Sequence, residues 1–162
     1  MRNKIALRLD LTYIFLFWVA IGQFVAYLIS NGLLVEFGEC LYQNFGVFIP
    51  SVHRMDKVVF FDNLVAKQYA SIFFFLIPFL FVTLLFSNVE ASVSEVRKNK
   101  KETYVAWVFF AVGSLAFIGG LNISGPKGIF HNSIYGFGLL AATMTFLSAY
   151  CFRIVLCIAF NK

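Results

Sequence analysis

Residues 71–86 read SIFFFLIPFLFVTLLF, a stretch without a charged side chain and with one proline near its middle. The chain around this stretch is equally apolar: 13% of its 162 residues are charged, 60% are hydrophobic, and the mean hydropathy is +0.83. A soluble domain has about 25% charged and about 45–50% apolar residues. The composition therefore predicts that lipid, not water, surrounds most of this chain.

Four windows of the sequence lack any charged side chain: 11–30, 70–86, 104–121 and 134–152. Helices of this length reach about 25–30 Å, which is the thickness of the hydrocarbon layer. The windows show no alternation of apolar and polar residues, which argues against barrel strands. The sequence thus predicts one all-α domain over 1–162, a polytopic bundle of four transmembrane helices.

The basic residues predict the orientation of this bundle. The N-terminal segment, the loop 87–103 and the C-terminal end hold nine of them: Arg2, Lys4, Arg8, Arg97, Lys98, Lys100, Lys101, Arg153 and Lys162. The other two loops hold four: Arg54, Lys57, Lys67 and Lys127. Because Lys and Arg accumulate on the cytoplasmic side, both termini and the 87–103 loop are predicted to be cytoplasmic. A bacterial inner membrane is the expected location.

The outer loop 31–69 carries apolar residues at intervals of three or four: Leu34, Phe37, Leu41, Phe45 and Phe48. This spacing predicts an amphipathic helix, ended by Pro50, that lies on the bilayer or on the bundle. Its aromatic residues either pack on the lipid headgroups or form a recognition surface. The run KVVFFDNLVAKQY at 57–69 could extend the second membrane helix outward.

The loop 87–103 has valines at helical spacing followed by a basic tip. Val89, Val93 and Val96 predict that the second helix continues into the cytoplasm and returns as a helical hairpin. The tip consists of Arg97, Lys98, Lys100 and Lys101. These residues either enforce the topology and contact anionic lipid, or bind a soluble partner.

Small residues recur along three of the predicted spans, and such stripes let helix backbones approach closely. The candidates for helix packing, within one copy or between copies of a homo-oligomer, are Gly22, Ala26, Gly113, Gly120, Gly138 and Ala142. Pro78 removes a backbone hydrogen bond from the second span and predicts a kink, which makes it a candidate hinge.

Few polar side chains fall in or beside the spans. Gln23 lies near the predicted midplane of the first span, where its amide needs a partner: a neighbouring helix or a pore. Arg153 interrupts an apolar run, and Asp10 precedes the first span. The topology puts both at the cytoplasmic edge, so we predict either an Asp10–Arg153 pair or an unpaired guanidinium that snorkels to the interface.

Signatures of enzymes are absent from the sequence. It contains no HExxH, GxSxG or phosphate-binding glycine loop and no intramembrane carboxylate pair, so no catalytic residue is predicted. The three cysteines form no CxxC, and no metal or cofactor site is expected. The net charge of +5 follows from the membrane topology, so we expect no direct binding of nucleic acid.

The start MRNKI, the four-span plan with both ends inside, and the basic loop RKNKK resemble the membrane subunit of the lambda Rex exclusion system. The organisation is also similar to that of the membrane subunit of the Kiwa anti-phage system. That resemblance implies sensing of phage attachment and recruitment of a cytoplasmic DNA-binding effector. The long first outer loop and the proline in the second span resemble immunity proteins against pore-forming colicins of the A type. The likeness covers most of the chain as a layout, and it transfers no functional residue.

These observations lead to one principal hypothesis and two alternatives. The principal one is a non-enzymatic, oligomeric membrane sensor or adaptor in anti-phage defence, which couples an outer event to a soluble cytoplasmic effector. The first alternative is an immunity protein against a pore-forming bacteriocin. The second is an ion-conducting effector, for which Gln23, Thr83, Ser114, Thr143 and Thr145 offer a polar lining.

Overall fold

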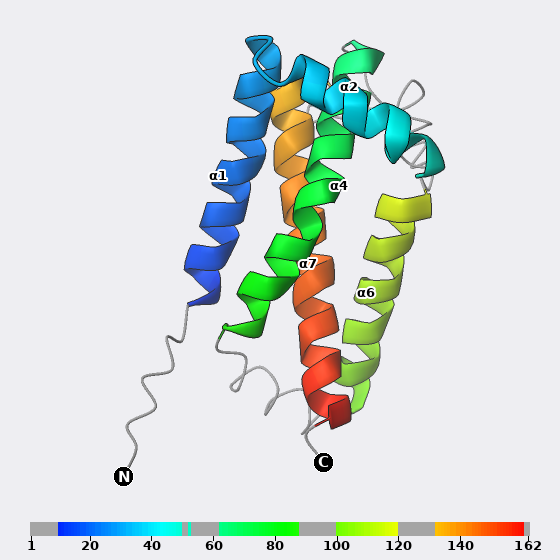
Figure 1. Ribbon diagram of the computed structural model, residues 1–162. Helices are drawn as coiled ribbons and strands as arrows, with labels where there is room; N and C mark the ends of the chain where they lie inside the picture. The colour runs from blue at the N-terminus through cyan, green and yellow to red at the C-terminus, as the bar shows by residue number, and fades with distance from the viewer. Residues whose placement is uncertain (1–9, 50–51, 53–61, 88–99, 120–131, 161–162) are drawn as a thin grey trace.

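A computed structural model describes residues 10–49, 52, 62–87, 100–119 and 132–160, which form helices and no strand. The long helices are α1 (Leu11–Ser30), α4 (Asn63–Leu85), α6 (Lys100–Gly119) and α7 (Ile134–Phe160). They run alternately up and down, so α1 begins and α7 finishes at the same end of the bundle (Figure 1). The short helix α2 (Val35–Asn44) and the 3-10 helix η1 (Gly46–Phe48) lie at the other end.

The ends of α1 follow from local hydrogen bonds. The Asp10 carboxylate accepts a hydrogen bond of 2.8 Å from the backbone N–H of Thr12, which caps the first turn. At the other end Gly32 adopts a φ of 76°, and the N–H groups of Gly32 and Leu33 donate to the carbonyls of Ile29 and Leu28. This arrangement is a Schellman motif, which glycine allows at low cost. It turns the chain sharply from α1 toward α2.

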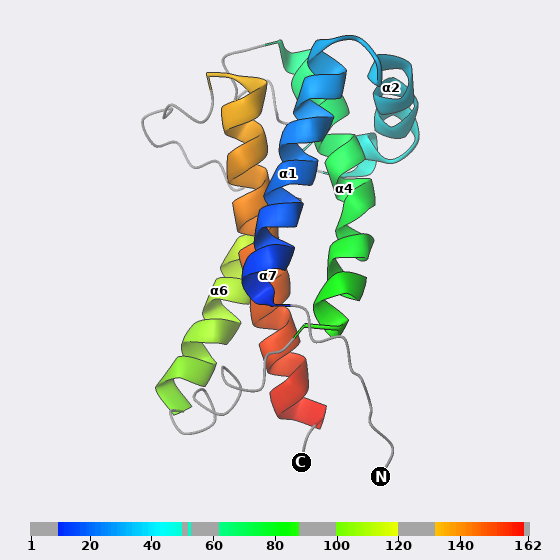
Figure 2. The same ribbon diagram turned by 90° about the vertical axis from the view of Figure 1, so that its left-hand side faces the viewer.

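The core lies where α1, α4 and α7 pack against one another. Helix α6 packs on α7, and Phe110 of α6 stacks on Phe152 of α7 with ring centroids 4.8 Å apart. Over residues 101–112 of α6, Ala106 is the buried residue, so most of that segment faces outward. Figure 2 shows α2 beside the upper turns of α4, on the flank away from α6. The described fold is a three-helix core with α6 on one flank and α2 on the other.

Helix α4 begins at Asn63, seven residues before the predicted span 70–86. It starts there because the Asp62 carboxylate accepts hydrogen bonds from the backbone N–H groups of Leu64 and Val65 at 2.7 and 3.4 Å. Residues 63–69 of the run 57–69 therefore extend this helix beyond the predicted span, whereas 57–61 lie outside the described residues. The helix continues through Pro78 without a break, and its lower part tilts away from its upper part in Figure 1. A bend is the expected effect of an internal proline.

The prediction that the second helix continues into the loop 87–103 is wrong at its start. Helix α4 ends at Leu85, and the N–H groups of Phe86 and Ser87 close turns onto Thr83 and Leu84. The hydroxyl of Ser87 also donates to the Leu84 carbonyl at 2.6 Å, a local bond that competes with helix continuation. Residues 88–99 of the predicted hairpin lie outside the described residues, and its last four residues form the first turn of α6.

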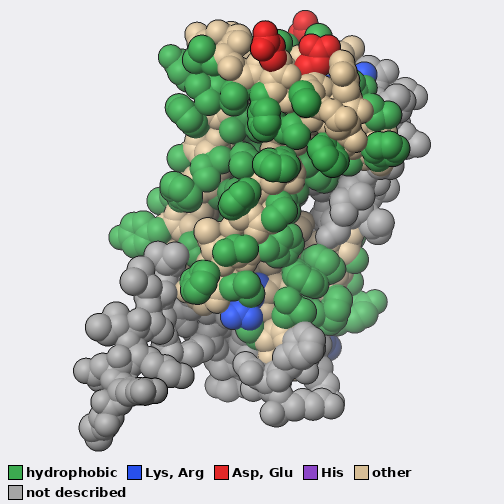
Figure 3. All heavy atoms as spheres, viewed as in Figure 1, with side chains coloured by type: hydrophobic (Ala, Val, Ile, Leu, Met, Phe, Trp, Pro, Cys, Tyr) green, Lys and Arg blue, Asp and Glu red, His purple; other side chains and the backbone are tan. Residues whose placement is uncertain are grey.

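Within the described residues, three helices are long and apolar enough to cross a membrane: Leu11–Ser30, Asn63–Leu85 and Ile134–Ile158. Their outward faces carry many exposed hydrophobic side chains, which Figure 3 shows spread over the described part of one face. Soluble proteins rarely expose so much apolar surface, whereas helices surrounded by hydrocarbon do. These features indicate a multi-pass membrane protein. A fourth crossing through α6 and residues 120–121, which lie outside the described part, stays a prediction.

Candidate functional site

The backbones of α1 and α7 cross closely at Gly22 and Gly138. A Cβ atom on Gly22 would lie 3.3 Å from the Cβ of Ala142 and 3.4 Å from the Gly138 carbonyl oxygen. A Cβ on Gly138 would lie 3.4 Å from the Gly22 carbonyl oxygen. Ala26, one turn further along α1, is fully buried. Four of the predicted packing residues therefore meet within one copy of the chain. Because Gly22 and Gly138 have no side chains, the crossing also has room for the Tyr69 hydroxyl of α4.

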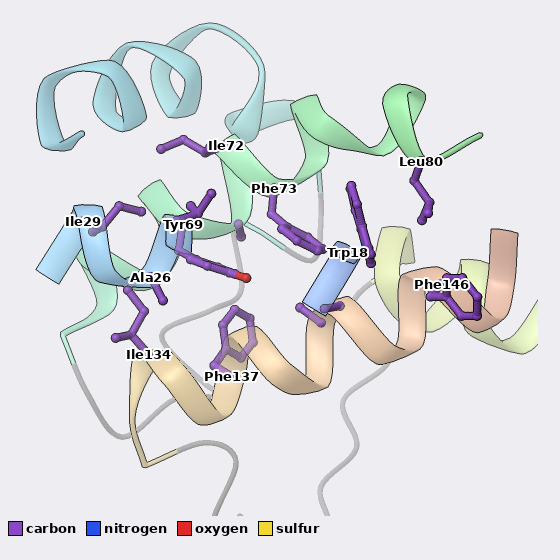
Figure 4. Packing of buried hydrophobic residues seen from close by; sticks show 14 of the residues in the cluster. Trp18, Ala26, Ile29, Tyr69, Ile72, Phe73, Leu80, Ile134, Phe137 and Phe146 are labelled. Atoms are coloured by element: carbon purple, nitrogen blue, oxygen red, sulfur yellow. The ribbon is translucent and has the colours of Figure 1, made fainter. Parts of the chain in front are cut away.

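Tyr69 connects all three core helices. Its side chain is fully buried, and its hydroxyl donates to the Gly22 carbonyl at 3.3 Å. The hydroxyl oxygen would be only 3.0 Å from a Cβ on Gly138. The ring stacks on Phe73 at 5.6 Å and meets Phe137 edge-on at 5.8 Å. Figure 4 shows Tyr69 directed from α4 toward the crossing of the other two helices. We call Gly22, Tyr69, Gly138 and Ala142 the helix junction.

Trp18 closes the core below the helix junction. Its indole N–H donates to the hydroxyl of Thr145 at 2.9 Å, and its ring lies 5.0 Å from that of Phe73. The Thr145 hydroxyl in turn donates to the Ala141 carbonyl at 2.8 Å. Trp18 and Thr145 are both buried, so each polar group has its partner inside the protein. This polar pair fixes the register of α1 against α7.

Gln23 donates from its side-chain nitrogen to the backbone carbonyl of Tyr135 at 3.0 Å. Gln23 is the thirteenth of the twenty residues of α1, and Tyr135 is the second residue of α7, so the partner of the amide lies on a neighbouring helix. Other proposed pore residues also bond within the chain: Thr83 to Leu80 at 2.8 Å and Thr143 to Leu139 at 2.9 Å. The side chain of Ser114 lies outside the described part. The described candidates thus satisfy their hydrogen bonds on helix backbones.

Helix α2 packs against the first turns of α4 through glycine. A Cβ on Gly38 would lie 2.9 Å from the Cβ of Gln68 and 3.2 Å from Cδ1 of Ile72. A Cβ on Gly46, in η1, would overlap the Ser71 hydroxyl. The ammonium group of Lys67 lies 5.7 Å from the centre of the Tyr42 ring, within cation–π range. These contacts hold α2 on the segment of α4 that carries Tyr69.

Most of the apolar residues predicted to recur along 34–48 lie on the surface of the structure. Leu41 is buried against the core, but Phe37, Phe45 and Phe48 are 47%, 62% and 82% exposed. Glycine at 38 lets the backbone of α2 approach α4, so bulky side chains are not needed at the contact. The aromatic side chains are therefore available to lipid or to a binding partner.

Gln68 is the most unusual polar group of the described structure. Its side chain is 1% exposed, and neither its amide nitrogen nor its amide oxygen has a hydrogen-bond partner. It lies directly under Gly38, next to Tyr69 in the sequence. A buried amide without a partner destabilises the arrangement that buries it, by about 1–3 kcal/mol. The packed position of α2 thus carries a free-energy penalty.

Replacing Gln68 with methionine is expected to raise the free energy of unfolding by about 1 kcal/mol, because it removes the uncompensated amide at similar volume. An unfolding titration with SDS in mixed micelles, followed by circular dichroism, measures the change. Gln23→Met is the matched control: its amide has a partner, so the variant is expected to lose stability. A less stable Gln68→Met protein would mean that the amide is hydrogen-bonded in solution.

Asp10 and Arg153 form no ion pair among the described residues, because the Asp10 carboxylate caps α1 instead. The Nε of Arg153 is buried and lacks a hydrogen-bond partner. Lys100 and Lys101 open α6, whereas Arg97, Lys98 and Gly120 lie outside the described residues, as do the surroundings of Gly113 within α6. The structure brings together Gly22, Ala26, Gly138 and Ala142, and it leaves Pro78 and Arg153 in the lower half of the bundle.

Sequence reasoning missed Trp18, Gly38, Gln68 and Tyr69. The last two fall in the predicted loop 31–69, at the end of the run 57–69 that could extend the second membrane helix. One signal could have found them: Asp62, an N-cap residue, followed by the apolar positions Val65, Ala66, Tyr69 and Ile72 at helical spacing. Gly38 is recognisable only once α2 is seen to touch another helix.

The described residues contain no group of three His, Cys, Asp or Glu side chains that could hold a metal ion. Cys40, Cys151 and Cys157 are free thiols. No protein-family model, curated protein or solved structure matches the chain.

Proposed function

We propose that this chain is a non-enzymatic inner-membrane sensor or adaptor of anti-phage defence, with both termini in the cytoplasm. In this proposal an outer event moves α2, the helix junction transmits the movement, and the cytoplasmic end engages a soluble effector. The support is an unbroken series of contacts: Gly38 of α2 lies on Gln68, the next residue is Tyr69, and Tyr69 reaches Gly22 and Gly138.

The single observation that carries the proposal is the orphaned amide of Gln68. A ligand can shift a protein between two arrangements only if their free energies are close. Burial of Gln68 without a partner raises the free energy of the arrangement in which α2 is packed, and solvation of the amide would lower that of an opened one. The contact between α2 and α4 is thus suited to a two-state role.

Pro78 provides a hinge between two unlike parts of α4. Above it, seven residues from Ala66 to Phe73 are buried; below it, Leu80 and Leu84 are the buried positions of the helix, and Phe79, Val82 and Leu85 are more than half exposed. The lower part has fewer contacts to break when it moves. A displacement of the upper part is expected to reach the cytoplasmic loop through this bend.

Leucine in place of Gly38 tests the first step. The side chain cannot fit against Gln68, so α2 is expected to leave α4, and amide hydrogen exchange in residues 35–44 is expected to rise at least about tenfold. Mass spectrometry of the intact protein in micelles measures this exchange. Cys40→Leu, at an exposed position of the same helix, is the control. Unchanged exchange in Gly38→Leu would show that α2 is not held by this contact.

The function itself is tested by purification from the native host under native expression, with identification of what co-elutes and the mass of the complex. A soluble cytoplasmic protein in fixed ratio with a homo-oligomer supports the sensor. Charge reversal of Arg97, Lys98, Lys100 and Lys101 is then expected to release that protein and to abolish protection in plaque assays. Full protection with preserved topology would overturn the cytoplasmic half of the proposal.

The exposed aromatic residues of the outer end favour a second candidate, immunity against a pore-forming bacteriocin. Phe45 and Phe48 offer a surface to a toxin domain in the outer leaflet. This candidate requires direct contact with the toxin and no cytoplasmic partner. Survival of cells exposed to pore-forming colicins, compared between the wild type and Phe45→Ser, Phe48→Ser, distinguishes it from the sensor.

A further inference from the structure

Arg153 directly follows the uncharged window 134–152 on α7. It is the twentieth residue of α7, so it lies about 28 Å along the helix from Ile134, close to the thickness of the hydrocarbon layer. Leu11, the first residue of α1, packs in the same cluster as Ile154 and Cys157. Phe81, in the last turns of α4, meets Phe152 edge-on at 5.7 Å. Helices α1 and α4 therefore end close to the level of Arg153, whereas α6 and α7 continue beyond it.

The base of the Arg153 side chain lies against the core. Ala149, one turn earlier on the same face of α7, is 1% exposed, and the neighbouring Ile154 is 4% exposed. The Nε atom is buried and has no hydrogen-bond partner, whereas the residue as a whole is partly exposed. The guanidinium thus has one buried N–H donor without a partner, and the rest of the side chain is partly exposed at the end of the α1, α4 and α7 core.

The described carboxylates do not supply a counter-ion. Asp10 caps α1, and Glu36, Glu39 and Asp62 belong to α2 and the start of α4, at the opposite end. Glu102 lies in the first turn of α6. On the face in Figure 3 the acidic side chains gather at the upper end, and a basic side chain lies among hydrophobic ones lower down. An anion for Arg153 has to come from outside these residues.

We propose that Arg153 binds the phosphate of a glycerophospholipid, in the leaflet at the end of the bundle where α1 begins. A planar guanidinium offers several donors in a geometry that matches phosphate oxygens. Phe152, the preceding residue, and Phe81, which meets it, are partly exposed apolar side chains that suit the acyl chains of the same lipid. This site does not depend on the proposed sensor role.

Native mass spectrometry of the protein released from micelles tests the site. Phosphatidylglycerol is titrated against the wild type, Arg153→Gln and Arg153→Lys. Binding by Arg153→Gln is expected to be roughly tenfold weaker, because a charge-assisted hydrogen bond is lost. Arg153→Lys is expected to fall between the two, since its ammonium is a point charge. Lys67→Gln, with the same change of charge at the opposite end, is expected to bind like the wild type.

Equal binding of phosphatidylglycerol by Arg153→Gln would overturn the proposal. A second comparison needs no variant: the wild type is expected to retain phosphatidylglycerol at least about fivefold better than a glucosyl diacylglycerol, which lacks phosphate. Equal retention of the two lipids would also overturn it. Displacement of the lipid by excess inorganic phosphate would identify free phosphate as the ligand, which contradicts a lipid site.

Discussion

Alanine in place of Trp18 is expected to lower the free energy of unfolding by about 3 kcal/mol, the lower end of the range for buried aromatic residues. The indole is 3% exposed, contacts Phe73 and donates to Thr145. The lower end applies because lipid is as apolar as the protein core, so packing and the hydrogen bond supply most of the loss. An SDS titration in mixed micelles, followed by circular dichroism, measures it.

Trp107 provides the matched control for this experiment. It lies on α6 with 48% of its side chain exposed, and Trp107→Ala is expected to change stability by no more than about 0.5 kcal/mol. Trp18→Phe separates packing from hydrogen bonding, because phenylalanine keeps a ring but cannot donate to Thr145. Equal losses in the two alanine variants would show that Trp18 does not hold the core together.

Valine in place of Gly138 is expected to destabilise the bundle by about 2 kcal/mol through overpacking. Its Cβ alone would lie 3.0 Å from the Tyr69 hydroxyl oxygen, and Tyr69 is fully buried and has no room to move aside. The helices α1 and α7 therefore have to separate. Leu139→Val introduces the same branched side chain at the next, exposed position of α7 and serves as the control. The same SDS titration measures both variants.

A double-mutant cycle tests whether Tyr69 is the obstacle. Tyr69→Phe removes the oxygen, after which the nearest ring atom, Cζ, lies 3.4 Å from the added Cβ, an ordinary contact distance. The double variant is expected to recover about 1 kcal/mol relative to the sum of the single changes. Strict additivity would show that the Tyr69 hydroxyl is not the obstacle.

The helical class and three of the membrane helices could be predicted because hydropathy reports what surrounds a segment. The uncharged windows 11–30 and 134–152 begin where α1 and α7 begin. The window 70–86 leaves out the first seven residues of α4, because hydropathy assigns Lys67 and Gln68 to water. In the structure Gln68 is buried, and the Lys67 ammonium lies near the Tyr42 ring. A single sequence does not show which segment will cover a polar residue.

The site could be predicted only where composition limits geometry. Small residues such as Gly22 and Gly138 mark close helix approach, but they do not say that a tyrosine from a third helix enters the crossing. The topology predicts that Asp10 and Arg153 lie at the same edge and either pair or stay apart. In the structure the Asp10 carboxylate accepts a hydrogen bond from the backbone N–H of Thr12 instead. The cap is favoured over an ion pair because an ion pair would also require the long Arg153 side chain to be ordered.

The bond between Trp18 and Thr145 spans 127 residues, and this separation bears on how the protein is made. During synthesis α1 is made long before α7. Until α7 is made, the indole N–H of Trp18 and the amide of Gln23 lack the hydrogen-bond partners that Thr145 and Tyr135 supply. The last helix therefore completes the first one. A chain whose translation stops before Ile134 would leave the Trp18 N–H and the Gln23 amide unpaired in hydrocarbon. These unpaired polar groups distinguish the unfinished chain from the folded protein.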